Sequence, residues 1–270
     1  MAIVSMRQLL DHAAENGYGL PAFNINNMEQ IQAITRAARD VDSPVIIQAS
    51  RGALRYTNLI YLKKLMEAAV EDNPGIKIAL HLDHGNDLDL IRTAVGLGFT
   101  SVMLDGSLEA DGKTPRSFES NVDITRRAVE IAHPHGVSVE GELGTLGGVE
   151  EHVAASHVIL TDPDEAVRFV EQTGVDALAV AIGTSHGAYK FKGEQHLDLE
   201  RAGRGAIVRT RGRADLHRLP RGLFLVWADV LIHNAGDDTP ASRLCRWPGL
   251  ASGVYAFSAA EPWLRLRAIM

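Results

Sequence analysis

The stretch Ile76-Lys-Ile-Ala-Leu-His-Leu-Asp-His-Gly-Asn86 decides the fold. It is a short apolar run with β-branched residues that ends in Asp83, His84 and Gly85. A strand of a parallel sheet is covered on both faces, so it is typically a near-continuous apolar run. Polar residues at the carboxyl end of such a strand lie where α/β barrels keep their chemistry. An acid next to an imidazole offers a proton-transfer group and a metal ligand, whereas the plainer alternative is that Asp83 caps the next helix and His84 packs in the core.

The same alternation of strand and helix runs along the chain to about residue 199. The expected strands are 20–25, 44–50, 76–82, 100–105, 136–143 and 176–182. Between them, helical patterns cover 88–97 and 118–132, and Asn27 and Asp162 are expected N-caps of two more helices. Pro163 at the first helical position and Glu165 three residues after the cap support the helix after Asp162. Six such units predict a parallel sheet covered by helices.

A doubly wound sheet and a barrel both satisfy this pattern, and two observations favour the barrel. After the first strand, Ala22-Phe-Asn-Ile-Asn26 stands in place of a Gly-rich dinucleotide loop. All six strands also end in polar residues, whereas a doubly wound sheet needs them only at its switch point. These residues are Asn24, Ser50, Asp83 with His84, Asp105, Glu140 with Glu142, and Ser185 with His186. We therefore expect an α/β fold of the (β/α)8 TIM barrel type, with residues 1–199 as its first six units.

The one long irregular connection, 144–161, follows the fifth strand. It holds Gly147-Gly148 near its start and Glu150-Glu151-His152 beyond. A loop of this length in a compact domain is usually functional or disordered. At the opening of a barrel, a loop with glycines at its base is expected to be a mobile lid.

Composition excludes several classes of function. The chain has 270 residues, is 46% hydrophobic and has a formal net charge of −7, which gives no reason to expect nucleic acid or an anionic membrane as a partner. Cys245 is the only cysteine, so an internal disulfide is impossible and a reducing compartment is natural. The first residues lack a signal-peptide core, and no apolar run is long enough to span a membrane. We expect a cytoplasmic protein.

The strand-end residues suggest a metal site when they are taken together. Singly, His84 and His186 are equally well explained as core or capping groups, and the carboxylates as turn or solvated residues. In a barrel, two imidazoles and several carboxylates around one opening make a good site for Zn²⁺ or a similar ion. The turn Gly183-Thr-Ser-His-Gly187 adds backbone N–H groups that can approach a phosphate or an oxyanion.

Four motifs stand in order along the chain: Leu80-His-Leu-Asp-His-Gly85, Ser101-Val-Met-Leu-Asp-Gly-Ser107, Val139-Glu-Gly-Glu-Leu-Gly144 with Gly147-Gly-Val-Glu-Glu151, and Ala181-Ile-Gly-Thr-Ser-His-Gly-Ala-Tyr189. Together they resemble the class II, metal-dependent fructose-1,6-bisphosphate aldolases. The resemblance implies a TIM barrel, a homodimer or larger homo-oligomer, catalytic Zn²⁺, a second divalent site and a monovalent cation. It also implies reversible cleavage of the sugar bisphosphate to dihydroxyacetone phosphate and glyceraldehyde 3-phosphate, a lyase reaction of glycolysis and of the Calvin cycle.

The resemblance assigns roles to the residues that carry metal and proton chemistry. His84 and His186 match two of three catalytic zinc ligands. Asp105 and Glu142 match carboxylates of a second or alternative metal position. Asp83 matches the acid/base that exchanges a proton with the C4 hydroxyl. A Lewis-acid metal makes a Schiff-base lysine unnecessary, and the strands before the two histidines contain no lysine suited to that task.

Four further residues match groups that contact the substrate or move its carbon-bound proton. Glu150, on the expected lid, matches the base that moves this proton. Ser50 matches a contact to the aldehyde half of the substrate, and Gly187 a contact to the dihydroxyacetone phosphate half. Asn24, at the end of the first strand, is placed with these substrate-binding residues.

The resemblance stops near residue 199, so 200–270 forms an anomalous second segment where the remaining barrel units are expected. The family's His-Gly-Gly/Ala-Ser loop with the third zinc ligand and its Asn-Ile-Asp-Thr-Asp phosphate loop are both missing. Our hypothesis is a change of reading frame in the nucleotide sequence. Codons permitted for 215–224, read one nucleotide later, can spell Thr-Phe-Thr-Val-Phe-His-Gly-Ala-Ser-Ser. If the segment is genuine, a catalytically impaired metal-binding barrel becomes the alternative.

Three other functions remain open at this point. A tagatose-bisphosphate aldolase differs only in the stereochemistry of its sugar, and sedoheptulose bisphosphate is another possible substrate. A zinc hydrolase that uses metal-bound water is the third. The Asp83-His84 pair and the expected lid glutamate favour enolisation over hydrolysis.

Overall fold

The computed structural model describes residues 3–16, 20–145, 147–148, 158–181, 185–186 and 224–225. For the three two-residue segments only the backbone is described. The predicted residues Glu150 and Gly187 lie outside these ranges, as does most of 200–270.

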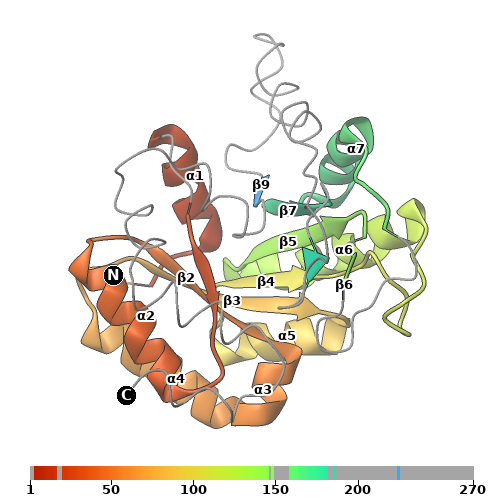
Figure 1. Ribbon diagram of the computed structural model, residues 1–270. Coiled ribbons are helices and arrows are strands. Elements are labelled where there is room, and N and C mark those ends of the chain that lie inside the picture. Colours follow the sequence, from red (N-terminus) through yellow and green to blue (C-terminus); the bar gives the residue numbers. More distant parts are fainter. Residues whose placement is uncertain are drawn as a thin grey trace.

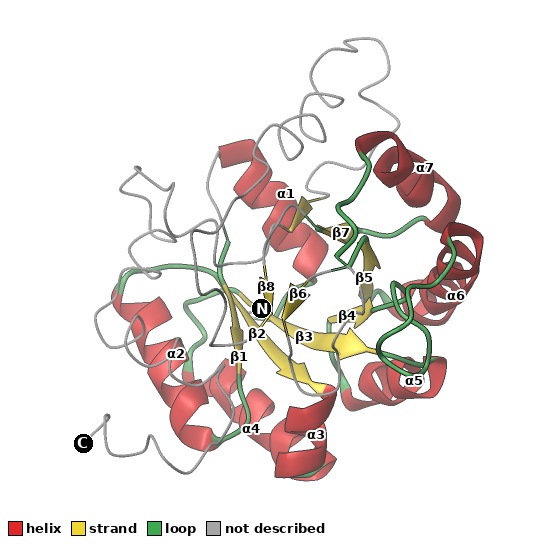
Figure 2. Cartoon of the chain, turned by 45° about the vertical axis from the view of Figure 1, so that its right-hand side comes forward, coloured by secondary structure: helices red, strands yellow, loops and turns green. Residues whose placement is uncertain are grey.

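Parallel strands form one sheet whose order follows the chain (Figures 1 and 2). Its strands are β1 Ala22–Asn24, β2 Val45–Ser50, β3 Ile78–Gly85, β4 Ser101–Leu104, β5 Ser138–Leu143, β7 Ala177–Val180 and β9 Phe224–Leu225. The helices are α1 Met6–Asn16, α2 Met28–Asp40, α3 Arg51–Thr57, α4 Leu59–Asp72, α5 Leu88–Leu97, α6 Phe118–Ala132 and α7 Pro163–Thr173, with a 3-10 turn η1 at His133–His135. From β1 to β7, helices join each strand of this sheet to the next and surround the curled sheet. Strand–helix units in this order are those of a (β/α)8 barrel.

Neighbouring residues of β1, β2, β3 and β7 belong to two separate apolar clusters. Val45, Ile47, Ile78 and Leu80, among others, pack with helices α2 and α4 to α7. Ile46, Ala79 and Ala177 belong instead to a smaller cluster with helix α1. Because successive side chains of a strand point to opposite faces, this division separates the outer face, under the helices, from the inner face. The inner face lines the barrel.

Capping side chains fix the helix boundaries where the sequence places them. Asp162 Oδ1 accepts from the backbone of Asp164 and Glu165 at the start of α7. Gly98 and Gly174 end α5 and α7 in the left-handed conformation. At α5 the N-cap is Asp87, whose Oδ1 accepts from Leu90 N at 2.8 Å. The plainer alternative, in which Asp83 caps this helix, is therefore wrong.

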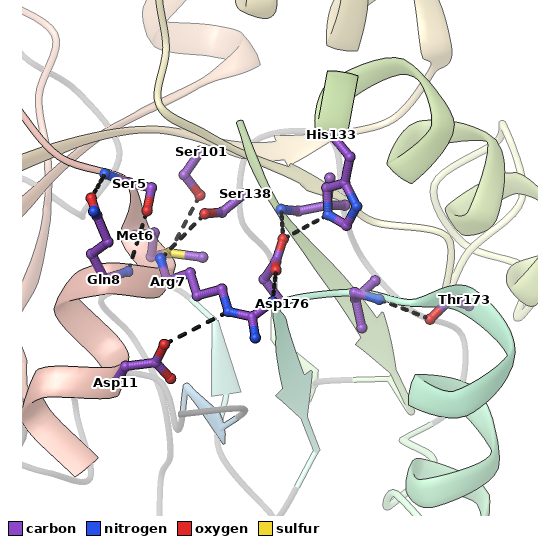
Figure 3. A network of polar contacts seen from close by, with 12 residues as sticks. Ser5, Met6, Arg7, Gln8, Asp11, Ser101, His133, Ser138, Thr173 and Asp176 are labelled. Carbon is purple, nitrogen blue, oxygen red and sulfur yellow. Dashed lines mark hydrogen bonds and ion pairs between the residues drawn. The ribbon is translucent and has the colours of Figure 1, made fainter. Parts of the chain in front are cut away.

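Helix α1, which the sequence analysis did not predict, closes the amino end of the barrel. Its apolar residues Met6, Leu9, Leu10 and Ala13 pack on the inner-face cluster. Polar contacts then anchor this helix: Arg7 N donates to Ser138 Oγ, and Arg7 Nη1 donates to Asp176 Oδ1 at 2.9 Å (Figure 3). The same carboxylate, just before β7, accepts from Val139 N and pairs with the His133 ring.

Two short features lie beyond the predicted elements. Strand β9 pairs in parallel with β7, so a strand exists in the segment where the sequence analysis found none. In the predicted lid connection, β6 Gly147–Gly148 pairs in parallel with β8 Ser185–His186. An antiparallel bridge between Thr145 and Ile159 closes the base of this connection. Within the described part of the chain, no helix has the length and apolar character needed to cross a membrane.

Candidate active site

A bulge in β3 places two consecutive polar side chains at the carboxyl end of the barrel. The pairing of β3 with β4 is regular up to Leu82 and then shifts, so that Gly85 pairs with Leu104. His84 at this irregularity has φ = 47°, a left-handed conformation that is uncommon for a residue with a side chain. A bulge re-aims the side chains of its strand. Here it directs His84 toward the end of β4, while Asp83 keeps the inner-face position expected from the alternation.

His84 meets two carboxylates from the next two strands. Its Nδ1 lies 3.2 Å from Asp105 Oδ2 and 3.7 Å from Glu142 Oε2. All three side chains are at most about a tenth exposed. Asp105 is held in turn by Ser107, whose backbone N–H and hydroxyl both donate to its Oδ1. We call these three residues, His84, Asp105 and Glu142, the mouth cluster.

The mouth cluster concentrates negative charge around one imidazole. Burial and the negative charge of Asp105 raise the pKa of Glu142 well above its ordinary value. Burial alone would raise the pKa of Asp105, but the hydrogen bond and charge of His84, with the Ser107 hydrogen bonds, hold it below its ordinary value. Burial likewise opposes protonation of His84, yet the charges of Asp83, Asp105 and Glu142 raise its pKa well above the ordinary range.

This donor set fits a divalent cation. One ligand atom from each member of the mouth cluster lies within 4.8 Å of the others. Among the described residues, Glu142 Oε2 is buried without a hydrogen-bond donor. A cation would compensate the like charges that raise the pKa of this carboxyl group, and an imidazole with carboxylate oxygens is a set that zinc and similar ions accept.

The structure therefore brings together four of the predicted site residues: Asp83, His84, Asp105 and Glu142. Ser50 is next to them, since it pairs with Asp83 in the register of β2 and β3. Its hydroxyl also caps α3 by accepting from Ala53 N. Asn24 ends β1, one strand farther from the mouth cluster, and its buried Oδ1 has no hydrogen-bond donor within the described ranges.

Of the remaining predicted residues, His186 lies in a described strand, whereas Glu150 and Gly187 are outside the described ranges. His186 is in β8, where the backbone pairs with Gly148 at the base of the predicted lid. The side chain of His186 is not described, and Glu150 and Gly187 are outside the described residues. The pairing of β6 and β8 nonetheless joins the two motifs on which these three residues lie.

Glu140 was predicted as a polar strand end, but its neighbours His81 and Ser101, which form a polar layer with it directly beneath the mouth cluster, were not predicted. His81, Ser101 and Glu140 lie on the inner faces of β3, β4 and β5, and each is at most 4% exposed. The signal was the two-residue period: His81 and Glu140 stand two positions before Asp83 and Glu142. Asn121 of α6 was also missed, and its buried amide donates to the backbone oxygen of Glu142.

The fold and the mouth cluster define an α/β barrel with a candidate metal site at the carboxyl ends of its strands. The family model for class-II fructose-bisphosphate aldolase matches residues 4–207. The chain belongs to the class II fructose-bisphosphate aldolase family. The resemblance that the four motifs carry is thereby confirmed, and family membership implies a divalent metal.

Individual relatives agree with this assignment. A fructose-bisphosphate aldolase from Nostoc sp. is 61% identical over 203 residues, which are 71% of this chain and 56% of that relative. The plasmid fructose-bisphosphate aldolase of Cupriavidus necator is 47% identical over 274 residues, covering 94% of this chain and 79% of that protein. Among solved structures, the YdjI aldolase from Escherichia coli K12 has a TM-score of 0.66 at 26% identity, covering 90% of this chain and 94% of that one. This chain thus spans little more than half the length of the Nostoc relative.

Proposed function

We propose that this chain catalyses the reversible cleavage of fructose 1,6-bisphosphate to dihydroxyacetone phosphate and glyceraldehyde 3-phosphate, with Zn²⁺ as its metal. The observation that carries the proposal is the mouth cluster, whose ligand atoms lie within 4.8 Å of one another beside Asp83. Family membership supplies the reaction class. The relatives named above are themselves fructose-bisphosphate aldolases.

In this proposal His84 and His186 hold the catalytic metal, and Asp105 and Glu142 offer a second or alternative divalent position. A bound Zn²⁺ supplies Lewis-acid polarisation of the substrate ketone. The Ser107 hydrogen bonds keep Asp105 ionised and oriented toward the imidazole, which favours cation binding. The raised pKa of Glu142 indicates a carboxyl group that gains from a neighbouring cation.

Asp83 is proposed as the acid/base for the C4 hydroxyl. Its carboxyl group is 98% buried on the inner face, one residue before the proposed ligand His84. This location holds a proton acceptor beside the metal and away from bulk water, as transfer to or from a bound substrate requires. Ser50, its neighbour in the strand register, is proposed to contact the aldehyde half, with Asn24 on the next strand also facing the substrate.

Glu150 on the lid is proposed to move the carbon-bound proton, and Gly187 to contact the dihydroxyacetone phosphate half. The pairing of Gly148 with His186 supports this arrangement, because it puts the start of the lid beside the strand that carries a proposed metal ligand. Two separate proton-transfer groups, Asp83 and Glu150, then serve the two carbon centres of the aldol reaction.

The proposal extends to the setting of the enzyme. We infer a cytoplasmic homodimer or larger homo-oligomer that acts in glycolysis and in the Calvin cycle, with sugar bisphosphates and triose phosphates as its substrates. From the same family resemblance we infer that a monovalent cation is also required. The family's third zinc ligand is expected in the barrel units that 200–270 would form. Its motif is absent from this sequence, and our hypothesis for the absence is a change of reading frame.

The test is a cleavage assay on the full chain with fructose 1,6-bisphosphate, coupled to reduction of the triose phosphates. We expect activity that is lost on dialysis against a chelator and restored by Zn²⁺, and that survives borohydride with substrate because no Schiff base forms. Tagatose and sedoheptulose bisphosphates, assayed in parallel, decide the sugar preference. Activity that resists the chelator and is trapped by borohydride would contradict the proposal.

A chain that binds metal without cleaving any of the three sugars would favour the catalytically impaired barrel. Resequencing the gene from codon 195, together with an intact mass of the protein, separates the two explanations of such a result. A shifted frame that restores the His-Gly-Ala-Ser loop would attribute the loss to a sequence error. A mass that matches the printed sequence would attribute it to the protein itself.

A further inference from the structure

A buried histidine that the proposed reaction does not use connects three strands beneath the mouth cluster. His81 Nδ1 lies 2.8 Å from Ser101 Oγ, and His81 Nε2 lies 3.3 Å from Glu140 Oε2. The exposed fractions of His81, Ser101 and Glu140 are 2%, 0% and 4%. Ser101 Oγ also contacts Met6 Sδ of α1 at 3.4 Å. The imidazole is therefore enclosed within the barrel, with polar groups at both of its nitrogens.

The chemistry of the two partners suits an imidazole here. A ring N–H at Nε2 can donate to the Glu140 carboxyl oxygen that it faces. A hydroxyl can accept or donate, so Ser101 satisfies Nδ1 in either ring form. Removing the ring would leave Glu140 buried without this donor, in a place where an unpaired carboxylate is costly.

The position of His81 in the strands relates it directly to the mouth cluster. It pairs with Ser101 in the regular register of β3 and β4, one residue before the last regular pair and the bulge that turns His84. It shares the inner face of β3 with Asp83, two residues on. Its partner Glu140 shares the inner face of β5 with Glu142, again two residues on. The link thus joins the strand that carries the ligand imidazole to the strand that carries the ligand carboxylate.

We propose that His81 is a positioning residue that holds the mouth cluster in its metal-binding geometry. It does so by fixing β3 against β5 at the level just below His84 and Glu142. This inference rests on the proposed function, since it concerns the metal site of the same reaction. Partners that contact a metal ligand directly typically change metal affinity by about 10- to 100-fold, and we expect His81, which acts through the strands that carry the ligands, to fall within this range.

The test measures metal binding rather than catalysis, with Co²⁺ as a spectroscopic probe on the full chain. Visible absorption of the Co²⁺ protein reports ligand geometry, and competition with a chelator gives the dissociation constant. For His81→Ala we expect the dissociation constant to rise by about 10- to 100-fold and the absorption bands to change. His81→Gln, whose amide can still donate to Glu140, should recover part of the affinity.

His133→Ala is the matched control, because His133 also pairs with a buried carboxylate, Asp176, but at the amino end of the barrel. It should destabilise the fold and leave the Co²⁺ affinity and spectrum of the wild type unchanged. If His81→Ala does not fold, His81→Gln and Ser101→Ala carry the test, each with one contact of the ring removed or weakened.

A folded His81→Ala chain with the Co²⁺ affinity and spectrum of the wild type would overturn the inference. If that chain does not fold, the same result in both His81→Gln and Ser101→Ala would overturn it. So would a wild-type chain that binds no Co²⁺. A wild type that binds Co²⁺, loses it through His81→Ala and cleaves no sugar bisphosphate would leave the positioning role intact and refute the proposed aldolase activity. The two proposals therefore fail on different measurements.

Discussion

The two ends of this barrel each place an imidazole beside a buried carboxyl group, and the surroundings of that group differ in sign between the two ends. At the amino end, Asp176 receives a donor on each side: Arg7 Nη1 at 2.9 Å, and His133 Nε2 and Val139 N at 2.8 and 2.9 Å (Figure 3). At the carboxyl end, Glu142 faces Asp105 and Glu140 as well as His84, and its pKa is raised where that of Asp176 is lowered.

The difference separates stability from function in physical terms. Burial opposes ionisation at both carboxyl groups, but at Asp176 the donors outweigh it, and the carboxylate ties α1, β5 and β7 together. At Glu142 the neighbouring charges add to the effect of burial, which leaves a site that is completed by a cation. In barrels of this type the amino end serves stability and the carboxyl end serves catalysis. The charges reproduce that division.

The largest expected effect comes from Asp83→Asn, which removes the acid/base and keeps the shape of the carboxyl end. Under the proposed mechanism, cleavage should slow by about 10²- to 10⁴-fold, the usual contribution of a positioned proton-transfer group. Because Asp83 is not assigned as a ligand, the metal content should stay at the wild-type level. Steady-state kinetics with metal analysis checks both. An unchanged rate would remove Asp83 from the mechanism.

Asp176→Asn should be the most destabilising of the changes at the amino end. The asparagine amide has one acceptor oxygen in place of two, and its N–H groups would face the donors that bind the carboxylate of Asp176. We expect a loss of about 2–3 kcal/mol in the free energy of unfolding. Because the Arg7 and His133 side chains are partly exposed, the loss of stability should be smaller than the sum expected for three charged hydrogen bonds. Denaturant unfolding measures it, and Co²⁺ affinity should not change.

Glu142→Gln tests the opposite sign at the carboxyl end. In the metal-free protein at mildly alkaline pH, the amide removes repulsion among Asp105, Glu140 and Glu142, so the fold should gain about 0.5–2 kcal/mol. The same change should weaken metal binding, since a carboxylate ligand is lost. Unfolding of the metal-free chain and Co²⁺ titration together test the comparison. If Glu142→Gln and Asp176→Asn changed stability in the same direction, the contrast between the two ends would fail.

Much of the fold followed from local signals in the sequence. The bounds of α5 and α6 and the start of α7 agree with prediction because caps such as Asp87 and Asp162 act within one helical turn. Helix α1 was missed because its stabilisation is long-range: its apolar residues have partners only once β2, β3 and β7 have assembled. Strand β9 has just two residues, too few to give a pattern.

The members of the site were predictable and their arrangement was not. Parallel strands end at one edge, so polar strand ends such as Asp83 and Asp105 were expected to meet. The left-handed backbone of His84 carries no sequence signal, because the surrounding barrel imposes it on a residue that disfavours it. His81 was not predicted for a different reason: a single polar residue within an apolar run is taken for a packed core residue unless the two-residue period is followed back from Asp83 along the strand.

The smallest expected effect is the pH dependence of the amino-end network. The pKa of Asp176 is lowered in the folded chain, so the folded state binds fewer protons than the unfolded state in acid. Its stabilisation should be complete above the unfolded pKa of about 3.9 and should be lost as pH falls through the folded value. The stability difference between wild type and Asp176→Asn should therefore stay constant from neutral pH to about pH 5 and shrink below about pH 4.

Asp123→Asn, which breaks only an exposed pair with Arg126, is the control and should show no such change. A difference that persists undiminished into strong acid would mean that Asp176 stabilises the barrel through its shape rather than its charge.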